Sequence, residues 1–169
     1  MGSHLPLAVA AALVVARFGV AQTPAAAMPS QWAVAPPLLP RGALIAVVSG
    51  DPAGPGESTI ELSMPDGYRM PPHFHPTDER IEVKQGTLLV GTGDRLDARK
   101  TMPVNVGDTA VAPAGVHHYS VARGETVVGV TFIGTYTITY VNPSEARDNG
   151  PFPSVTSDGG GSSYRAASS

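Results

Sequence analysis

The sequence predicts an all-β fold, either a sandwich or a barrel. Between residues 43 and 141, short runs alternate apolar and polar side chains with a period of two, and turn residues separate them at roughly ten-residue intervals. The 169 residues include 19 Gly and 17 Pro, and only 15% are charged, a composition that favours many turns and few long helices. This length indicates one domain with room for a core.

The expected strands follow one another along this region. The first is the β-branched, apolar run ALIAVVS at Ala43–Ser49, and the second is STIELSM at Ser58–Met64, in which every second residue is apolar. The glycine- and proline-rich segments 50–57 and 65–72 interrupt the pattern and are expected to be turns. The later strands are expected in the segments 80–85, 86–94, 102–106, 109–112, 117–122, 125–133 and 135–141, with a turn at Gly107–Asp108.

Charge and cysteine content exclude several classes of function. The net charge of −3 provides no basic surface for a nucleic acid. The chain has no cysteine, which excludes disulfides, thiolate metal sites and cysteine nucleophiles. A transition-metal site in this chain would therefore consist of histidine, carboxylate and water ligands.

The first 21 residues resemble a secretory signal peptide. The apolar run Leu5–Val15 is too short to span a bilayer, and Gly19, Val20 and Ala21 offer small residues for cleavage after Ala21. The alternative is an apolar N-terminal helix that packs on the domain, and the start MGSH also resembles a vector-derived sequence. We expect a secreted or periplasmic bacterial protein with no membrane association once the signal is removed.

The remainder of the chain divides into three segments. Residues 22–41 form a Pro/Ala-rich arm with an edge strand expected around Gln31–Ala35. Residues 42–143 form the strand-rich domain, and residues 144–169 are polar and are expected to form a flexible tail.

Histidines outside the leader fall into two clusters, and the first includes a carboxylate. In a strand, His73 and His75 point to one side and Phe74 to the other. Glu79 shares the apolar phase of the next strand with Ile81, whereas residues 80, 82 and 84 are charged and must face water. A buried carboxylate needs a cation or donors, and a metal held jointly with the histidines would supply one.

Strand phase alone does not decide which histidine of the second cluster, His117 or His118, points inward. One phase contains His117 with Tyr119 and Val121, and the other contains His118 with Val116 and Ser120. Apolarity slightly favours His117 as the inward residue.

Two motifs resemble those of the cupin superfamily, in particular its small exported bacterial single-domain members. The first motif has the family's spacing at Gly67, His73, His75, Glu79 and Gly86. The second has it at Gly107, Pro113, Gly115 and His118, although Ala122 stands where the family has Asn. The resemblance covers about residues 42–143.

This resemblance implies a double-stranded β-helix, a jelly-roll-like barrel with a metal in its mouth. Carried over position by position, the metal ligands are His73, His75, Glu79 and His118. His117 is then a neighbour of the site. Many members are dimers, so a homodimer is expected.

Three imidazoles and one carboxylate suit one divalent transition metal, with Mn or Fe expected first and Ni, Co, Cu or Zn as alternatives. The site would carry a formal charge of about plus one and should favour a small, anionic, oxygen-donor ligand. Candidates for a catalytic general base are His117, Tyr119 and a metal-bound hydroxide.

The prediction for function is a metal-dependent enzyme, an oxidoreductase such as a dioxygenase, that acts on a small organic substrate. The alternatives are a non-redox lyase or isomerase, for example one resembling hydroxynitrile lyases, and a non-catalytic protein that binds metal or a small ligand.

Overall fold

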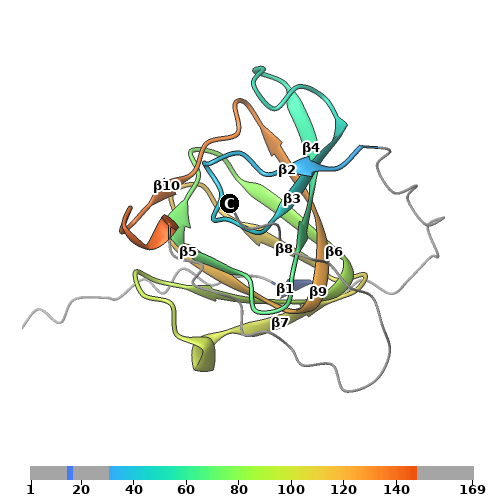
Figure 1. Ribbon diagram of the computed structural model, residues 1–169. Coiled ribbons are helices and arrows are strands. Elements are labelled where there is room, and N and C mark those ends of the chain that lie inside the picture. The colour runs from blue at the N-terminus through green and yellow to red at the C-terminus, as the bar shows by residue number, and fades with distance from the viewer. Residues whose placement is uncertain (1–14, 17–30, 148–169) are drawn as a thin grey trace, which may run out of the picture.

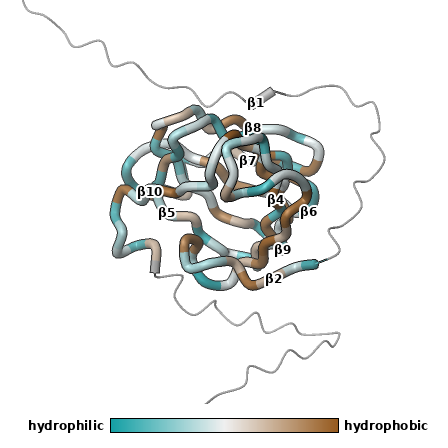
Figure 2. The backbone as a smooth tube through the Cα atoms, turned by 90° about the horizontal axis from the view of Figure 1, so that it is seen from above, coloured by the Kyte–Doolittle hydropathy of each residue, from teal (hydrophilic) through white to brown (hydrophobic). Residues whose placement is uncertain are grey.

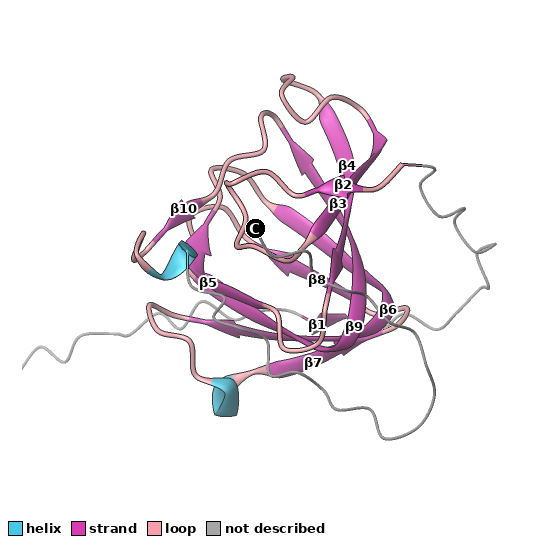
Figure 3. Cartoon of the chain, in the orientation of Figure 1, coloured by secondary structure: helices cyan, strands magenta, loops and turns pink. Residues whose placement is uncertain are grey.

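The computed structural model describes residues 15–16 and 31–147, which form a curled antiparallel β-sheet (Figure 1). Its strands, drawn as magenta arrows in Figure 3, are β1 (Val15–Ala16), β2 (Ala33–Val34), β3 (Leu44–Ser49), β4 (Glu57–Met64), β5 (Arg69–Phe74), β6 (Glu79–Thr92), β7 (Met102–Asn105), β8 (Thr109–Ala112), β9 (His118–Ile133) and β10 (Thr139–Tyr140). Two short 3-10 helices are η1 (Ala98–Lys100) and η2 (Glu145–Arg147). The prediction of an all-β fold is confirmed.

Two long strands, β6 and β9, hold the barrel together because each pairs with different strands along its two halves. The main path of pairing runs β1-β8-β6-β9-β4-β3-β2, and β5, β7 and β10 attach to the side of it. The first half of β9 pairs with β5 and with the end of β6, and its second half pairs with β4 and with the start of β6.

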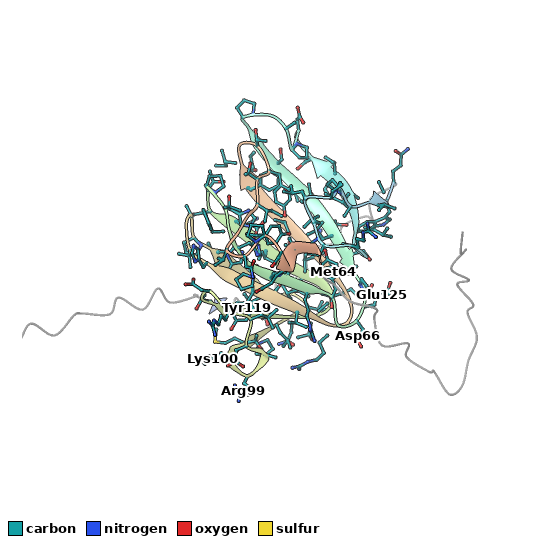
Figure 4. All side chains as sticks on the ribbon, turned by 60° about the vertical axis from the view of Figure 1, so that its left-hand side comes forward. Met64, Asp66, Arg99, Lys100, Tyr119 and Glu125 are labelled. Carbon is teal, nitrogen blue, oxygen red and sulfur yellow. The ribbon has the colours of Figure 1, made fainter. Side chains whose placement is uncertain are left out.

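Both long strands bend at a glycine, which explains why the sequence pattern predicts each as two strands. Gly86 in β6 has φ +73° and Gly124 in β9 has φ +71°, backbone conformations that side chains disfavour. The register between β6 and β9 shifts on either side of Gln85. Asp66 accepts the amide of Gly124 at 2.6 Å and supports the second bend, which lies beside Asp66 and Glu125 in Figure 4.

The prediction of a turn over residues 65–72 is wrong for its second half, since β5 includes Pro71 and Pro72. The register of β5 against β9 shifts between Met70 and His73, so the two prolines fall at an irregularity in the ladder. A proline that donates no hydrogen bond is tolerated at such a position.

The prediction of a strand at 135–141 holds only for its end, where β10 pairs with β5. The preceding residues bond elsewhere: the amide of Tyr136 donates to the carbonyl of Pro52 at 2.8 Å, and the Thr135 hydroxyl donates to the carbonyl of Ala53 at 3.2 Å. This segment therefore lies against the 51–54 turn instead of in the sheet.

Alternation along the strands places the core inside the barrel. On β6, Glu79, Ile81 and Val83 are buried, while Arg80 and Glu82 are exposed, as predicted. Hydrophobic stretches of β6 and β9 appear brown in Figure 2. The buried core includes Ile60, Leu62, Met64, Tyr68, Met70, Ile81, Val83, Leu88, Val90, Val104, Val128, Val130 and Phe132.

Lys84 departs from the predicted exposed phase of β6. It is half-buried on the outer face of the sheet, and its Nζ lies 2.7 Å from Oε1 of Glu61, which is itself only 1% exposed. Gly129 makes room for the lysine stem, because a Cβ there would sit 3.0 Å from Cε of Lys84.

The structure tests only some of the predictions for the N-terminal segment. β2 pairs with β3 at the end of the main path, which confirms an edge strand within residues 31–35. β1 pairs with β8 and lies within the predicted signal peptide, whose cleavage stays a prediction. The rest of segment 1–30 and the tail from residue 148 lie outside the described residues. Within the described part of the chain, no helix has the length and apolar character needed to cross a bilayer.

Candidate metal centre

Three histidines from β5 and β9 meet inside the barrel. His73 lies near the end of β5 and pairs across the ladder with His118, the first residue of β9. His75 follows β5 directly, two residues beyond His73. All three side chains are buried, and each offers one ring nitrogen within 4.8 Å of the others, a group that could hold a metal ion.

Backbone carbonyls orient each of these rings in the same way. Nδ1 of His73 lies 2.7 Å from the Pro71 carbonyl, and Nδ1 of His118 lies 2.9 Å from the Val116 carbonyl. Nδ1 of His75 lies 2.7 Å from the Thr137 carbonyl. Because a carbonyl only accepts, each Nδ1 carries the proton, which leaves each Nε2 with a free lone pair.

Two of these Nε2 atoms are buried polar atoms without a partner. Among the described residues, neither Nε2 of His75 nor Nε2 of His118 has a hydrogen-bond partner. A buried nitrogen left unpaired costs about 1–3 kcal/mol. A metal ion at this point would satisfy both atoms.

Glu79 supplies the carboxylate of the site from the first position of β6. Its Oε2 lies 3.4 Å from Nε2 of His75 and 3.8 Å from Nε2 of His118. Burial by itself would raise the pKa of Glu79, but its interactions with His118, His75 and His73 outweigh burial and lower that pKa. The carboxyl group is therefore ionised at neutral pH.

His73 is uncharged under the same conditions. Burial, with the adjacent His118 and His75, lowers the pKa of His73 to about 3. A neutral imidazole is the form that binds a metal. Three imidazoles whose Nδ1 atoms face carbonyls, together with one carboxylate, therefore fit a divalent transition metal.

A small cavity of about 40 Å³ adjoins the histidines and has room for a few water-sized groups. Most of its wall is apolar, and the polar side chains on it are those of His73, Glu79, His118, Ser120 and Tyr136. The apolar wall consists of Leu62, Met64, Met70, Ile81, Leu88, Val90, Val128 and Val130.

Sequence reasoning missed Tyr136, which lies in the loop between β9 and β10. Its ring stacks on His75 with centroids 5.9 Å apart and packs on Phe132 at 4.8 Å. Burial, and secondly the charge of Glu79, raise the pKa of Tyr136 well above its usual value, so the hydroxyl stays protonated. Alternation in segment 135–141 predicts a strand and gives no indication of this position.

The structure places His117 and Tyr119 outside this cavity. The ring of His117 stacks on Phe74 at 5.0 Å, and its Nδ1 lies 2.6 Å from Oδ1 of Asp94 at the surface. His118, and not His117, therefore joins the first histidine cluster, which apolarity alone did not favour.

Tyr119 is fully buried beneath the loop that carries η1, and its hydroxyl donates to the carbonyl of Asp97 at 3.2 Å. Figure 4 shows Tyr119 above the loop residues Arg99 and Lys100. The catalytic roles suggested for His117 and Tyr119 stay predictions.

The family comparison covers most of the chain. The sequence model of the family described as "Domain of unknown function (DUF4437)" matches residues 31–158, about three quarters of the 169 residues. Germin-like protein 5-1 from Oryza sativa subsp. japonica is 36% identical over 83 residues, which make up 45% of this chain and 37% of that protein. The chain thus spans little more than a third of the length of this curated relative.

Solved structures with the same architecture are similar in fold at low sequence identity. A putative acetylacetone dioxygenase from Methylibium petroleiphilum has a TM-score of 0.54 at 17% identity, covering 70% of this chain and 79% of its own. KdgF from Halomonas sp. has a TM-score of 0.50 at 22% identity, with 63% and 87% covered. A cupin 2 domain-containing protein from Halorhodospira halophila has a TM-score of 0.51 at 18% identity, with 62% and 73% covered.

The buried histidine group, the two spaced motifs and these structural neighbours agree on one assignment. The chain belongs to the DUF4437 family, and its fold is that of the cupin structures to which it is similar.

Proposed function

We propose that this protein is a metal-dependent enzyme, an oxidoreductase such as a dioxygenase, that acts on a small oxygen-donor organic substrate. One Mn or Fe ion is held by His73, His75, Glu79 and His118. The observation that carries the proposal is the convergence of three oriented imidazoles and one ionised carboxylate beside an apolar cavity.

The protein's own groups divide the work between binding and orientation. The carbonyls of Pro71, Val116 and Thr137 hold the imidazoles with their Nε2 atoms toward one point. The apolar wall excludes bulk water and receives the hydrocarbon part of a substrate. When bound, the metal supplies Lewis acidity or redox capacity and a net positive charge for an anionic oxygen.

The choice of a dioxygenase as the first reaction to test has two supports. Mn and Fe suit this donor set and permit redox chemistry. The structural relative described as a putative acetylacetone dioxygenase shares the barrel. Oxygen uptake by iron- or manganese-loaded protein with small enolisable substrates tests the reaction. Turnover without oxygen would instead indicate a lyase or isomerase, and the absence of turnover would favour a non-catalytic binding protein.

The ligand set is tested by metal analysis of protein purified without added metal and after reconstitution. His75→Ala and Glu79→Ala should each abolish tight metal binding. His117→Ala is the matched control, because its side chain lies outside the cavity and its loss should leave one metal per chain. Wild-type protein without bound metal in either preparation would refute the proposal, and metal loss in the control would mean that the wrong histidine is assigned.

We propose further that the protein is exported and forms a homodimer. The apolar run Leu5–Val15 supports export, which fractionation of cells expressing the natural gene would test. The edge strand β2 and its neighbour β3 support self-association, since Val34 is 81% exposed and Leu44 40% exposed. Light scattering should give a molecular mass of twice that of one chain, and Val34→Glu should lower this mass to that of a single chain. A monomeric wild-type protein would contradict the dimer.

A further inference from the structure

We propose that the hydroxyl of Tyr136 is the hydrogen-bond donor for the oxygen group of a small aliphatic ligand that occupies the cavity beside the histidines. This inference rests on the proposed function, because it names the kind of molecule that the same site accepts and the residue that orients it.

The hydroxyl of Tyr136 differs from those of the other described tyrosines. Tyr68 donates to the carbonyl of Pro40 at 2.7 Å, Tyr140 to that of Leu38 at 2.9 Å, and Tyr119 to that of Asp97 at 3.2 Å. Among the described residues, Tyr136 makes no such hydrogen bond, although the residue lines the cavity. Tyr136 is only partly buried, and its hydroxyl is a donor that no other described residue occupies, so a ligand in the cavity can accept a hydrogen bond from it.

The position of Tyr136 directs this donor to the ligand end that faces the metal site. Its ring is held by stacking on His75 and by packing on Phe132. It lines the cavity together with His73, and it also lines a smaller recess together with His75 and Glu79. A group bound between the histidines and the cavity is therefore within reach of the phenol.

The remaining wall restricts the rest of the ligand. The cavity of about 40 Å³ has room for only a few heavy atoms, and most of its wall is aliphatic. Met64 and Met70 are flexible side chains that can adapt to the shape of a branched ligand. We therefore expect a short aliphatic molecule with one anionic oxygen group, such as a carboxylate, at the end near Tyr136.

The test uses cobalt-loaded full-length protein, because the visible absorption of Co²⁺ reports a change in its ligands independently of turnover. Acetate, isobutyrate and hexanoate serve as probes, titrated by calorimetry and by absorption. Isobutyrate should bind more tightly than hexanoate, because hexanoate exceeds the cavity. Tyr136→Phe should weaken isobutyrate binding about tenfold or more, as expected for a lost hydrogen bond to a charged group, without changing cobalt affinity.

Tyr140→Phe is the matched control, because its ring lies 5.9 Å from that of His73 but its hydroxyl already has a backbone partner. It should bind isobutyrate as the wild type does. Isobutyrate affinity within twofold of wild type for Tyr136→Phe, or no binding of any of the three probes to cobalt-loaded protein, would overturn the inference and leave the metal site intact. Failure of the wild type to bind cobalt would instead refute the proposed function.

Discussion

Replacement of Lys84 by Met should strongly destabilise the barrel, although Lys84 lies on the outer face of the sheet. Lys84 is the cation beside Glu61, with Nζ and Oε1 2.7 Å apart. The other carboxylate oxygen of Glu61 has no hydrogen-bond partner among the described residues. Lys84→Met keeps the length of the stem but leaves a buried carboxylate without its counter-ion.

The structure sets the size of this effect. Removal of one partner of a buried ion pair costs about 3–5 kcal/mol. The Lys84 side chain is 21% exposed, so water reaches the vacated site and the loss should fall near the lower end, about 3 kcal/mol. Glu61→Gln should cost less, because the ammonium group that remains can turn toward solvent.

Urea unfolding of the metal-free protein, followed by circular dichroism, measures these free energies. The double variant Glu61→Gln/Lys84→Met should recover much of the loss seen with Lys84→Met, since no buried charge remains, and the cycle gives the coupling energy. Lys100→Met is the control, because Lys100 is exposed in η1 and its change should stay within about 0.5 kcal/mol. A loss below about 1 kcal/mol for Lys84→Met, or no recovery in the double variant, would refute the reasoning.

Two further predictions concern pH and packing. The folded pKa of His73 is about 3, below its value of 6.5 in the unfolded chain, so its stabilising contribution is complete above pH 6.5 and falls as pH drops toward 3. Urea unfolding of the metal-free protein between pH 6 and 4 measures this loss. The free energy of unfolding of His73→Gln should fall less steeply with pH than that of the wild type, by up to about 1.4 kcal/mol per pH unit. Equal pH dependence of the two proteins would contradict this. Gly91→Ala should cost about 1–3 kcal/mol, because a Cβ there overlaps the buried ring of Tyr119. Gly56→Ala, which meets no atom within 4 Å, should unfold at nearly the wild-type urea concentration, and equal stability of the two variants would argue against the overlap.

The strands and the first half of the site could be predicted from the local pattern of apolar and polar residues. Alternation on β6 depends only on which residues are apolar, and it correctly placed Glu79 on the buried side. The same period of two put His73 and His75 on one side of the chain, although β5 ends at Phe74. Residues close together in sequence share a strand, so their relative directions follow from the chain itself.

Other features depended on contacts between distant segments. Phase alone did not favour His118 over His117, because Tyr119 is buried under the η1 loop and makes both sides of β9 look apolar. Pro71 is tolerated in β5 because the ladder with β9 is irregular there. Tyr136 reaches the cavity because its segment bonds to the 51–54 turn.

By itself, the sequence determined the all-β class, the buried direction of Glu79 and the pairing of two histidines on one face, since a strand's period relates near neighbours. Strand phase left the second pair open, the spacing of the second motif indicated His118, and the tertiary structure brings His118 to the other two histidines. Only the tertiary structure decided that Lys84 neutralises Glu61 and that Tyr136 borders the cavity. Each of these depends on two or more segments separated by tens of residues, and their meeting is set by how β6 and β9 bend and pair around the core.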